Sequence, residues 1–132
     1  MFLHIRSSDS LKSRSTFDTE DREFAYRLLR AWLHTLRDRL TVEASAHFAA
    51  QLPDLIRDIF YAGWNPSAVP EMYDAEASAA RFAREAIIAP DDVGKAAAAT
   101  TAAVLLHLPP PQMDKALDQL PREIRSLLQA QR

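Results

Sequence analysis

The sequence contains no cysteine and only two glycines, and both absences exclude classes of function. Without cysteine the chain has no disulfide, no thiol nucleophile and no cysteine-ligated zinc. Gly63 and Gly94 are far apart, so a glycine-rich phosphate loop or dinucleotide fingerprint is impossible. No apolar run reaches the roughly 20 residues that a membrane span requires. Residues 1–6 lack the hydrophobic region of a secretion signal, and we expect a cytoplasmic protein with no membrane partner.

The charge of the chain is low and evenly mixed. Among 132 residues, 16 lysines and arginines stand against 18 aspartates and glutamates, which gives a net charge of −2. No basic face is apparent in the sequence, so we do not expect nucleic-acid binding. Because β-branched residues are sparse and no segment alternates with a period of two, the sequence predicts an all-α fold.

A short segment occurs twice in the chain. Gln51–Arg57 reads Gln-Leu-Pro-Asp-Leu-Ile-Arg, and Gln119–Arg125 reads Gln-Leu-Pro-Arg-Glu-Ile-Arg. We call the distance in sequence between equivalent positions, such as 51 and 119, the repeat offset. The same offset pairs Ala31 with Ala99, Leu36 with Val104, Leu40 with Leu108, Ile59 with Leu127 and Phe60 with Leu128. We therefore predict a bundle of seven or eight helices, built from two similar repeats about a pseudo-twofold axis.

The repeat divides the chain into four segments of one compact domain. Residues 1–18 form a poorly specified N-terminal segment, in which the serine-rich composition predicts a loop and the repeat predicts a helix. Residues 19–63 form the first repeat, 64–73 the connection and 74–132 the second repeat.

Capping residues predict the limits of the helices. Asp18 or Thr19 begins the first clear helix, whose apolar stripe runs to Leu40, and Thr41 is the N-cap of the next. A third helix runs from Pro53 to Ala62, followed by a left-handed Gly63.

In the second repeat, Asp74 caps a helix that runs to Ala89, with Ile87 among its inward-facing residues. Asp91 caps an alanine-rich helix over 92–107, whose small side chains place it in the middle of the bundle. Helices near 110–119 and 121–130 complete the unit.

His34 and Asp38 are the main candidates for a chemical function. They lie one helical turn apart and could share a proton or a metal, while the neighbouring Arg37 and Arg39 keep Asp38 ionised and compete for it. The commoner interpretation is an exposed, salt-bridged helix face. None of the four histidines forms a pair with metal-ligand spacing, so we expect no metal and no cofactor.

Arg57 and Arg125 occupy equivalent places in the two repeats, each four residues after a proline. Their guanidinium groups could bind carbonyls left open at the preceding helix end, or the side chains of Gln51 and Gln119. The alternative is an anion pocket between the halves.

Three aromatic residues, Tyr61, Trp64 and Tyr73, cluster around the connection between the repeats. They form either a packed hinge or an exposed anchor for a partner protein. The groove between the repeats is also a natural place for a partner helix or a small apolar ligand.

The chain resembles a known family along two runs, Leu33-His34-x-Leu36-Arg37-Asp38-Arg39-Leu40 and Gln51-Leu52-Pro53 through Ile56-Arg57 to Gly63-Trp64-x-Pro66. Over about residues 19–130 it is similar to the bacterial domain-of-unknown-function family numbered 2267. The resemblance implies a small helical cytosolic protein made of two similar halves, and it implies no particular activity, cofactor or substrate. The serine-rich N-terminus departs from the amphipathic helix usual in that family.

Two functions follow as hypotheses. The first is a non-enzymatic protein-interaction or adaptor module that binds a protein partner or forms a homo-oligomer. The alternative is an enzyme or small-ligand-binding protein that uses a surface of His34, Asp38 and neighbouring arginines. No nucleophile elbow or Ser–His–Asp arrangement supports the enzyme.

Overall fold

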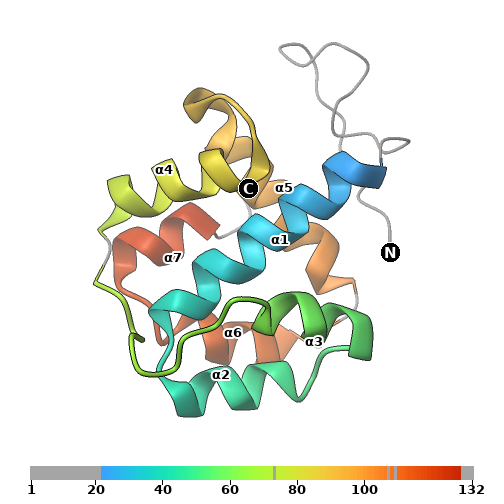
Figure 1. Cartoon of the computed structure of the whole chain (residues 1–132), viewed down its shortest axis with the longest axis vertical. Coiled ribbons are helices and arrows are strands. Elements are labelled where there is room, and N and C mark those ends of the chain that lie inside the picture. Colours follow the sequence, from blue (N-terminus) through green and yellow to red (C-terminus); the bar gives the residue numbers. More distant parts are fainter. Residues whose placement is uncertain (1–21, 73, 107, 109, 129–132) are drawn as a thin grey trace.

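The computed structural model describes residues 22–72, 74–106, 108 and 110–128. Within these ranges the chain forms seven α-helices, one 3₁₀ turn and no strand, which confirms the all-α prediction (Figure 1). The helices are α1 (Arg22–Arg39), α2 (Val42–Ala49), α3 (Asp54–Tyr61), α4 (Ala75–Ala86), α5 (Val93–Leu105), α6 (Pro110–Leu117) and α7 (Arg122–Leu128). The N-terminal segment, where an eighth helix and the Asp18 or Thr19 cap are predicted, lies outside the described residues.

Local capping signals set several helix ends as predicted. The Thr41 hydroxyl accepts a hydrogen bond from the Ala44 N–H at 3.1 Å, and the Asp74 carboxylate accepts one from the Ala77 N–H at 2.8 Å. Each bond satisfies a backbone donor that the first helical turn leaves open. Gly63 follows α3 with a φ of +74°, the left-handed conformation expected there.

The C-terminal end of α4 differs from the prediction. The helix ends at Ala86, and Ile87 adopts a φ of 58° with 69% of its surface exposed, so its predicted inward position is wrong. The left-handed residue turns the chain back, and the Ile88 N–H donates to the Ala83 carbonyl at 3.0 Å. The predicted Asp91 cap is also wrong, because a 3₁₀ turn over Pro90–Asp92 leads into α5.

Helix α1 crosses the middle of the molecule, and α3, α4 and α5 pack against it (Figure 1). Helix α5 also packs against α4 and α7, and its fully buried Ala96 and Ala97 agree with the predicted central position. Trp32, Phe60 and Phe82 are the largest fully buried side chains, and they belong to one core. The core therefore draws on both halves of the chain.

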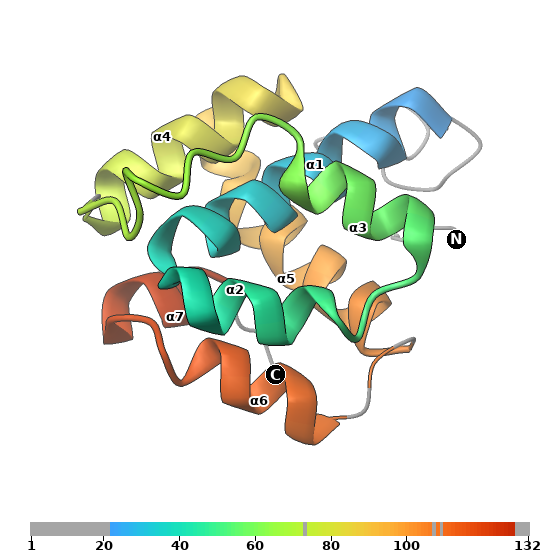
Figure 2. The ribbon, with the colours of Figure 1, turned by 60° about the horizontal axis from the view of Figure 1, so that its bottom comes forward.

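Helices α2 and α6 lie side by side at one end of the bundle (Figure 2). Helix α6 begins one repeat offset after the start of α2 and ends one repeat offset after its end. Helix α7 begins one repeat offset after the start of α3. The limits of α1 and α5 do not match in this way, so the repeat and its pseudo-twofold axis stay predictions. In the described part of the chain, no helix is both long and apolar enough to cross a membrane.

Candidate functional site

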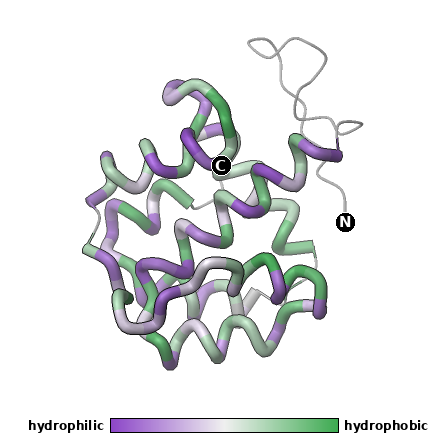
Figure 3. Tube along the Cα trace, viewed as in Figure 1, coloured by the Kyte–Doolittle hydropathy of each residue, from purple (hydrophilic) through white to green (hydrophobic). Residues whose placement is uncertain are grey.

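Three polar residues of α1 are buried. His34, Arg37 and Asp38 are each only 3% exposed, so the interpretation of an exposed helix face is wrong in its exposure, although these side chains do form salt bridges. The physical reason is that α4 and the C-terminal end of α3 both pack against this part of α1 (Figure 3 shows the polar positions on α1 and α4). Buried ionic groups of this kind require partners.

Both ring nitrogens of His34 face hydrogen-bond acceptors. Its Nδ1 lies 2.7 Å from Glu85 Oε2, and its Nε2 lies 2.8 Å from the Ile59 carbonyl oxygen. A carbonyl oxygen can only accept, so Nε2 carries a hydrogen. Whether Nδ1 also carries a hydrogen depends on the protonation state of Glu85.

The pKa of Glu85 reflects opposing effects. Burial raises this pKa, but the hydrogen bond from His34 and the positive charges of His34, Arg30 and Arg81 outweigh it and hold the pKa below its ordinary value. At neutral pH Glu85 is therefore a carboxylate, which also only accepts, so both ring nitrogens of His34 face acceptors and act as donors. His34 has no lone pair left to bind a metal ion or to accept a proton.

Asp38 binds two arginines instead of sharing a proton or metal with His34. Arg37 Nε donates to Asp38 Oδ1 at 2.7 Å, and Arg81 of α4 donates to Asp38 Oδ2. Arg37 Nη1 also donates to the Phe60 and Ala62 carbonyls, at 3.0 and 2.7 Å. A guanidinium is well placed there, because the last carbonyls of α3 lack partners within the helix and carry its negative dipole end.

A shallow pocket of about 370 Å³, the arginine pocket, opens over this network. Its lining is formed by Arg30, His34, Arg37, Ala62, Gly63, Arg81, Arg84 and Glu85. With Asp38 behind it, the site holds four guanidinium groups against two carboxylates. It is thus strongly positive in a chain whose net charge is −2.

Two of the four guanidinium groups are accessible. Arg84 is exposed and forms no hydrogen bond or ion pair with any residue that the structure describes. The Arg30 side chain is 42% exposed and lies 3.2 Å from Glu85. Because arginine presents several N–H donors in one plane, these groups suit a carboxylate or phosphate.

Sequence reasoning did not identify Arg81, Arg84 and Glu85 as part of the site. The spacing of these three residues in the sequence could have indicated them. They lie on adjacent turns of one side of α4, as the polar residues of the site do on α1. Two polar helix sides that each carry arginines and a carboxylate can pair with each other. Only the packing of α4 on α1 shows that these two do.

The aromatic residues of the connection pack at the end of α3. The rings of Tyr61 and Trp64 are 4.9 Å apart, those of Phe60 and Tyr61 are 5.2 Å apart, and Trp64 is half-buried. Gly63 places this cluster beside the arginine pocket. Tyr73, the third predicted member, lies outside the described residues.

Arg57 and Arg125 both contact the end of the preceding helix, through different groups. Arg57 donates to the Ala49 and Leu52 carbonyls at 3.1 and 2.8 Å, and it pairs with Asp54. Arg125 pairs instead with Asp118, at 2.7 Å.

The side chains of Gln51 and Gln119 are exposed, and Gln119 lines a second pocket. Across the described ranges, no group of three or more histidine, aspartate or glutamate side chains is placed to hold a metal ion.

Comparison with known proteins identifies a family. No curated protein matches the chain. The model of the family described as "Uncharacterized conserved protein (DUF2267)" matches residues 12–127, which is most of the sequence. This chain, with its buried Leu-His-x-Leu-Arg-Asp-Arg-Leu run on α1, belongs to the DUF2267 family.

Proposed function

We propose that this protein is a non-enzymatic protein-interaction module whose arginine pocket binds an anionic group of a partner protein. The observation that carries the proposal is the charge of the pocket, four guanidinium groups against two carboxylates in a chain with an overall negative charge. Such a local field attracts a carboxylate or a phosphate and steers its approach.

The shape of the pocket favours a group carried by a larger partner. It is shallow and open to solvent, and polar side chains dominate its lining. Sites for free small molecules are concave and mostly apolar, because they bury most of the ligand. An acidic or phosphorylated side chain needs only its charged tip to be held, while the rest of the partner contacts the surrounding surface.

The internal hydrogen bonds of the site favour binding over catalysis. His34 donates from both nitrogens, and Asp38 accepts from two arginines. Neither group is available as a general base, which must reach and accept a substrate proton. These bonds hold Arg37 and Arg81 in place behind the accessible Arg30 and Arg84, so the pocket is ordered before a ligand arrives.

The proposal can be tested with a fluorescein-labelled hexaglutamate peptide and fluorescence anisotropy at low salt. We expect Arg84→Ala to weaken binding about threefold to fivefold, the usual effect of one partly exposed ion pair. Arg122→Ala removes an exposed arginine of α7 outside the pocket and is the matched control. Its Kd should remain that of the wild-type protein.

Equal losses in the two variants would show unspecific attraction and reject the proposal. Tighter binding of a single-stranded oligonucleotide, lost in Arg84→Ala, would instead make the pocket a nucleic-acid site. The salt dependence of both titrations separates these outcomes, because nucleic acid releases counterions on binding.

A further inference from the structure

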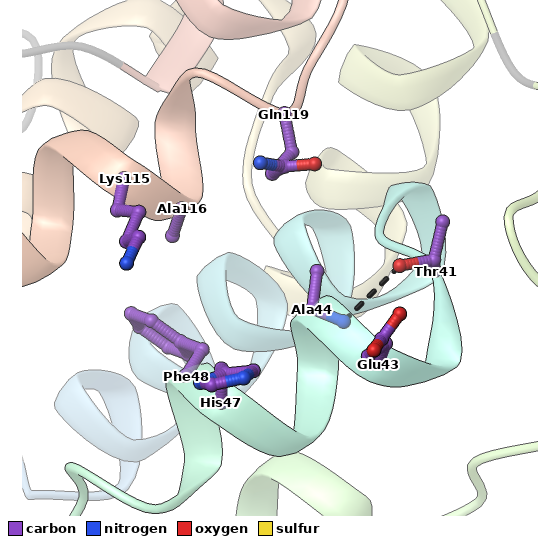
Figure 4. Close-up of a pocket in the computed structure, with 8 residues that line it drawn as sticks. All are labelled: Thr41, Glu43, Ala44, His47, Phe48, Lys115, Ala116 and Gln119. Carbon is purple, nitrogen blue, oxygen red and sulfur yellow. Dashed lines mark hydrogen bonds between the residues drawn. The ribbon is translucent and has the colours of Figure 1, made fainter.

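A second pocket, of about 230 Å³, lies between α2 and α6, away from the arginine pocket (Figure 4). Eight residues line it, namely Thr41, Glu43, Ala44, His47, Phe48, Lys115, Ala116 and Gln119. Phe48 and Ala116 are almost completely buried and form an apolar floor with Ala44. The remaining side chains are polar, and they form the rim.

The charges on the rim are separated along the pocket. Figure 4 shows Lys115 and His47 on the side of Phe48, and Glu43 and Thr41 at the other end. The Gln119 side chain lies between these ends on the α6 side. A ligand therefore meets a cation and an imidazole at one end, an amide in between and a carboxylate at the other end.

The room for this pocket comes from a difference between the two repeats. At the repeat offset, Phe48 of α2 corresponds to Ala116 of α6, and His47 corresponds to Lys115. The two helices thus contribute a large ring and a small methyl group at matching positions. A second phenylalanine at position 116 would occupy the space that the alanine leaves open.

We propose that this pocket binds a small aromatic carboxylate. The ring lies on Phe48, Ala44 and Ala116, where its apolar surface leaves water. The carboxylate accepts hydrogen bonds from Lys115 and His47, and Glu43 repels it from the opposite end.

This ligand class satisfies both parts of the lining. An inorganic anion would leave the apolar floor uncovered, and a neutral hydrocarbon would cover Lys115 without giving it a partner. A hydroxyl group on the far side of the ring would donate to Glu43. The volume of about 230 Å³ fits a single ring.

The test uses 4-hydroxybenzoate and two-dimensional ¹⁵N–¹H NMR of the full chain. We expect saturable shifts of the amide signals of Ala44, Phe48 and Ala116. Two comparison probes separate the contributions, since 4-hydroxybenzamide keeps the ring without the charge and acetate keeps the charge without the ring. Both should bind more weakly, and equal affinity of 4-hydroxybenzamide would overturn the role of Lys115.

Two variants locate the site, and a third controls for charge. Lys115→Gln should weaken 4-hydroxybenzoate binding about fivefold, as expected for one partly exposed ion pair. Ala116→Phe should abolish saturable shifts, and Lys115→Gln decides the question if the larger residue prevents folding. Lys95→Gln changes an exposed lysine of α5 outside the pocket and should leave the Kd unchanged.

Unchanged binding in Lys115→Gln, or shifts centred on Arg84, would overturn the proposal. The site does not depend on the arginine pocket, so Arg84→Ala should retain full 4-hydroxybenzoate binding. A loss of hexaglutamate binding with intact 4-hydroxybenzoate binding would distinguish the two sites.

Discussion

At the residue scale, the charged side chains between α1 and α4 form one network. Asp38 is held by Arg37 and Arg81, and Glu85 is held by His34 and Arg30. Removing one member of a buried ionic network leaves its partner charged and uncompensated, which costs more than the pair contributes. The network therefore fixes the packing of α4 on α1 as well as the geometry of the arginine pocket.

The pH dependence of the free energy of unfolding should reveal the lowered pKa of Glu85. Its pKa is lower in the folded than in the unfolded chain, so its stabilising contribution is present above about pH 4.5 and is lost as the pH falls through the folded pKa. We expect Glu85→Gln to lower the free energy of unfolding by about 2 kcal/mol at pH 7, the scale of a hydrogen bond to a charged group. Urea denaturation at pH 7 and pH 3.5 measures the difference, which should shrink at the lower pH.

Glu123→Gln provides the control, because Glu123 is an exposed carboxylate of α7. Its effect should be small at both pH values. A penalty for Glu85→Gln that stays constant or grows on acidification would contradict the assignment of an ionised Glu85 beside His34.

The sequence identifies part of this site but not its chemistry. His34 and Asp38 stand out by their spacing, yet the partners of His34 lie 51 and 25 positions away in the chain. Helical periodicity places these residues on the side opposite the Leu28 and Leu36 stripe, and it cannot show that a second polar helix covers them. The burial and the hydrogen-bond partners of His34 depend on tertiary contacts that a single sequence does not encode as a local pattern.

At the element scale, the helix ends that were predicted correctly are those set by local bonds. Thr41 and Asp74 each bind an N–H three residues ahead, and Gly63 supplies a positive φ where L-residues are strained. The end of α4 has no such signal, since an isoleucine occupies the left-handed position. β-Branched residues disfavour that conformation, so packing of the following turn must impose it.

This strain gives a prediction for Ile87. Ile87→Gly should raise the free energy of unfolding by about 1 kcal/mol, because glycine adopts a positive φ without the clash of Cβ. The isoleucine is 69% exposed, so little buried apolar surface is lost. Thermal and urea denaturation of the variant measure the gain.

Leu106→Gly is the matched comparison. Leu106 also follows a helix and is 79% exposed, but its φ of −71° is right-handed. Glycine there should only add freedom to the unfolded chain and lower the stability. Equal destabilisation by both substitutions would show that Ile87 is not strained.

At the scale of the whole molecule, Thr101 joins three helices. Its hydroxyl oxygen accepts a hydrogen bond from Trp32 Nε1 at 2.8 Å, and the same oxygen lies within bonding distance of the Ala97 and Leu128 carbonyls. The contact therefore links α1 of the first half to α5 and α7 of the second. With a single core drawn from both halves, the described helices should unfold as one unit.

Thr101→Val tests this linkage, because valine has nearly the same shape and leaves the buried Trp32 N–H without an acceptor. We expect a loss of about 1–3 kcal/mol, the cost of an unsatisfied buried donor. The control is Thr100→Val, since the Thr100 hydroxyl is equally buried but, among the described residues, bonds only to the Ala96 carbonyl of its own helix. The free energy of unfolding should fall by less in Thr100→Val than in Thr101→Val. Urea titrations followed by tryptophan fluorescence and by far-UV circular dichroism should coincide in the wild-type protein. If the two probes separate in the wild-type protein, the halves unfold independently, and the Trp32–Thr101 bond does not join them into one cooperative domain.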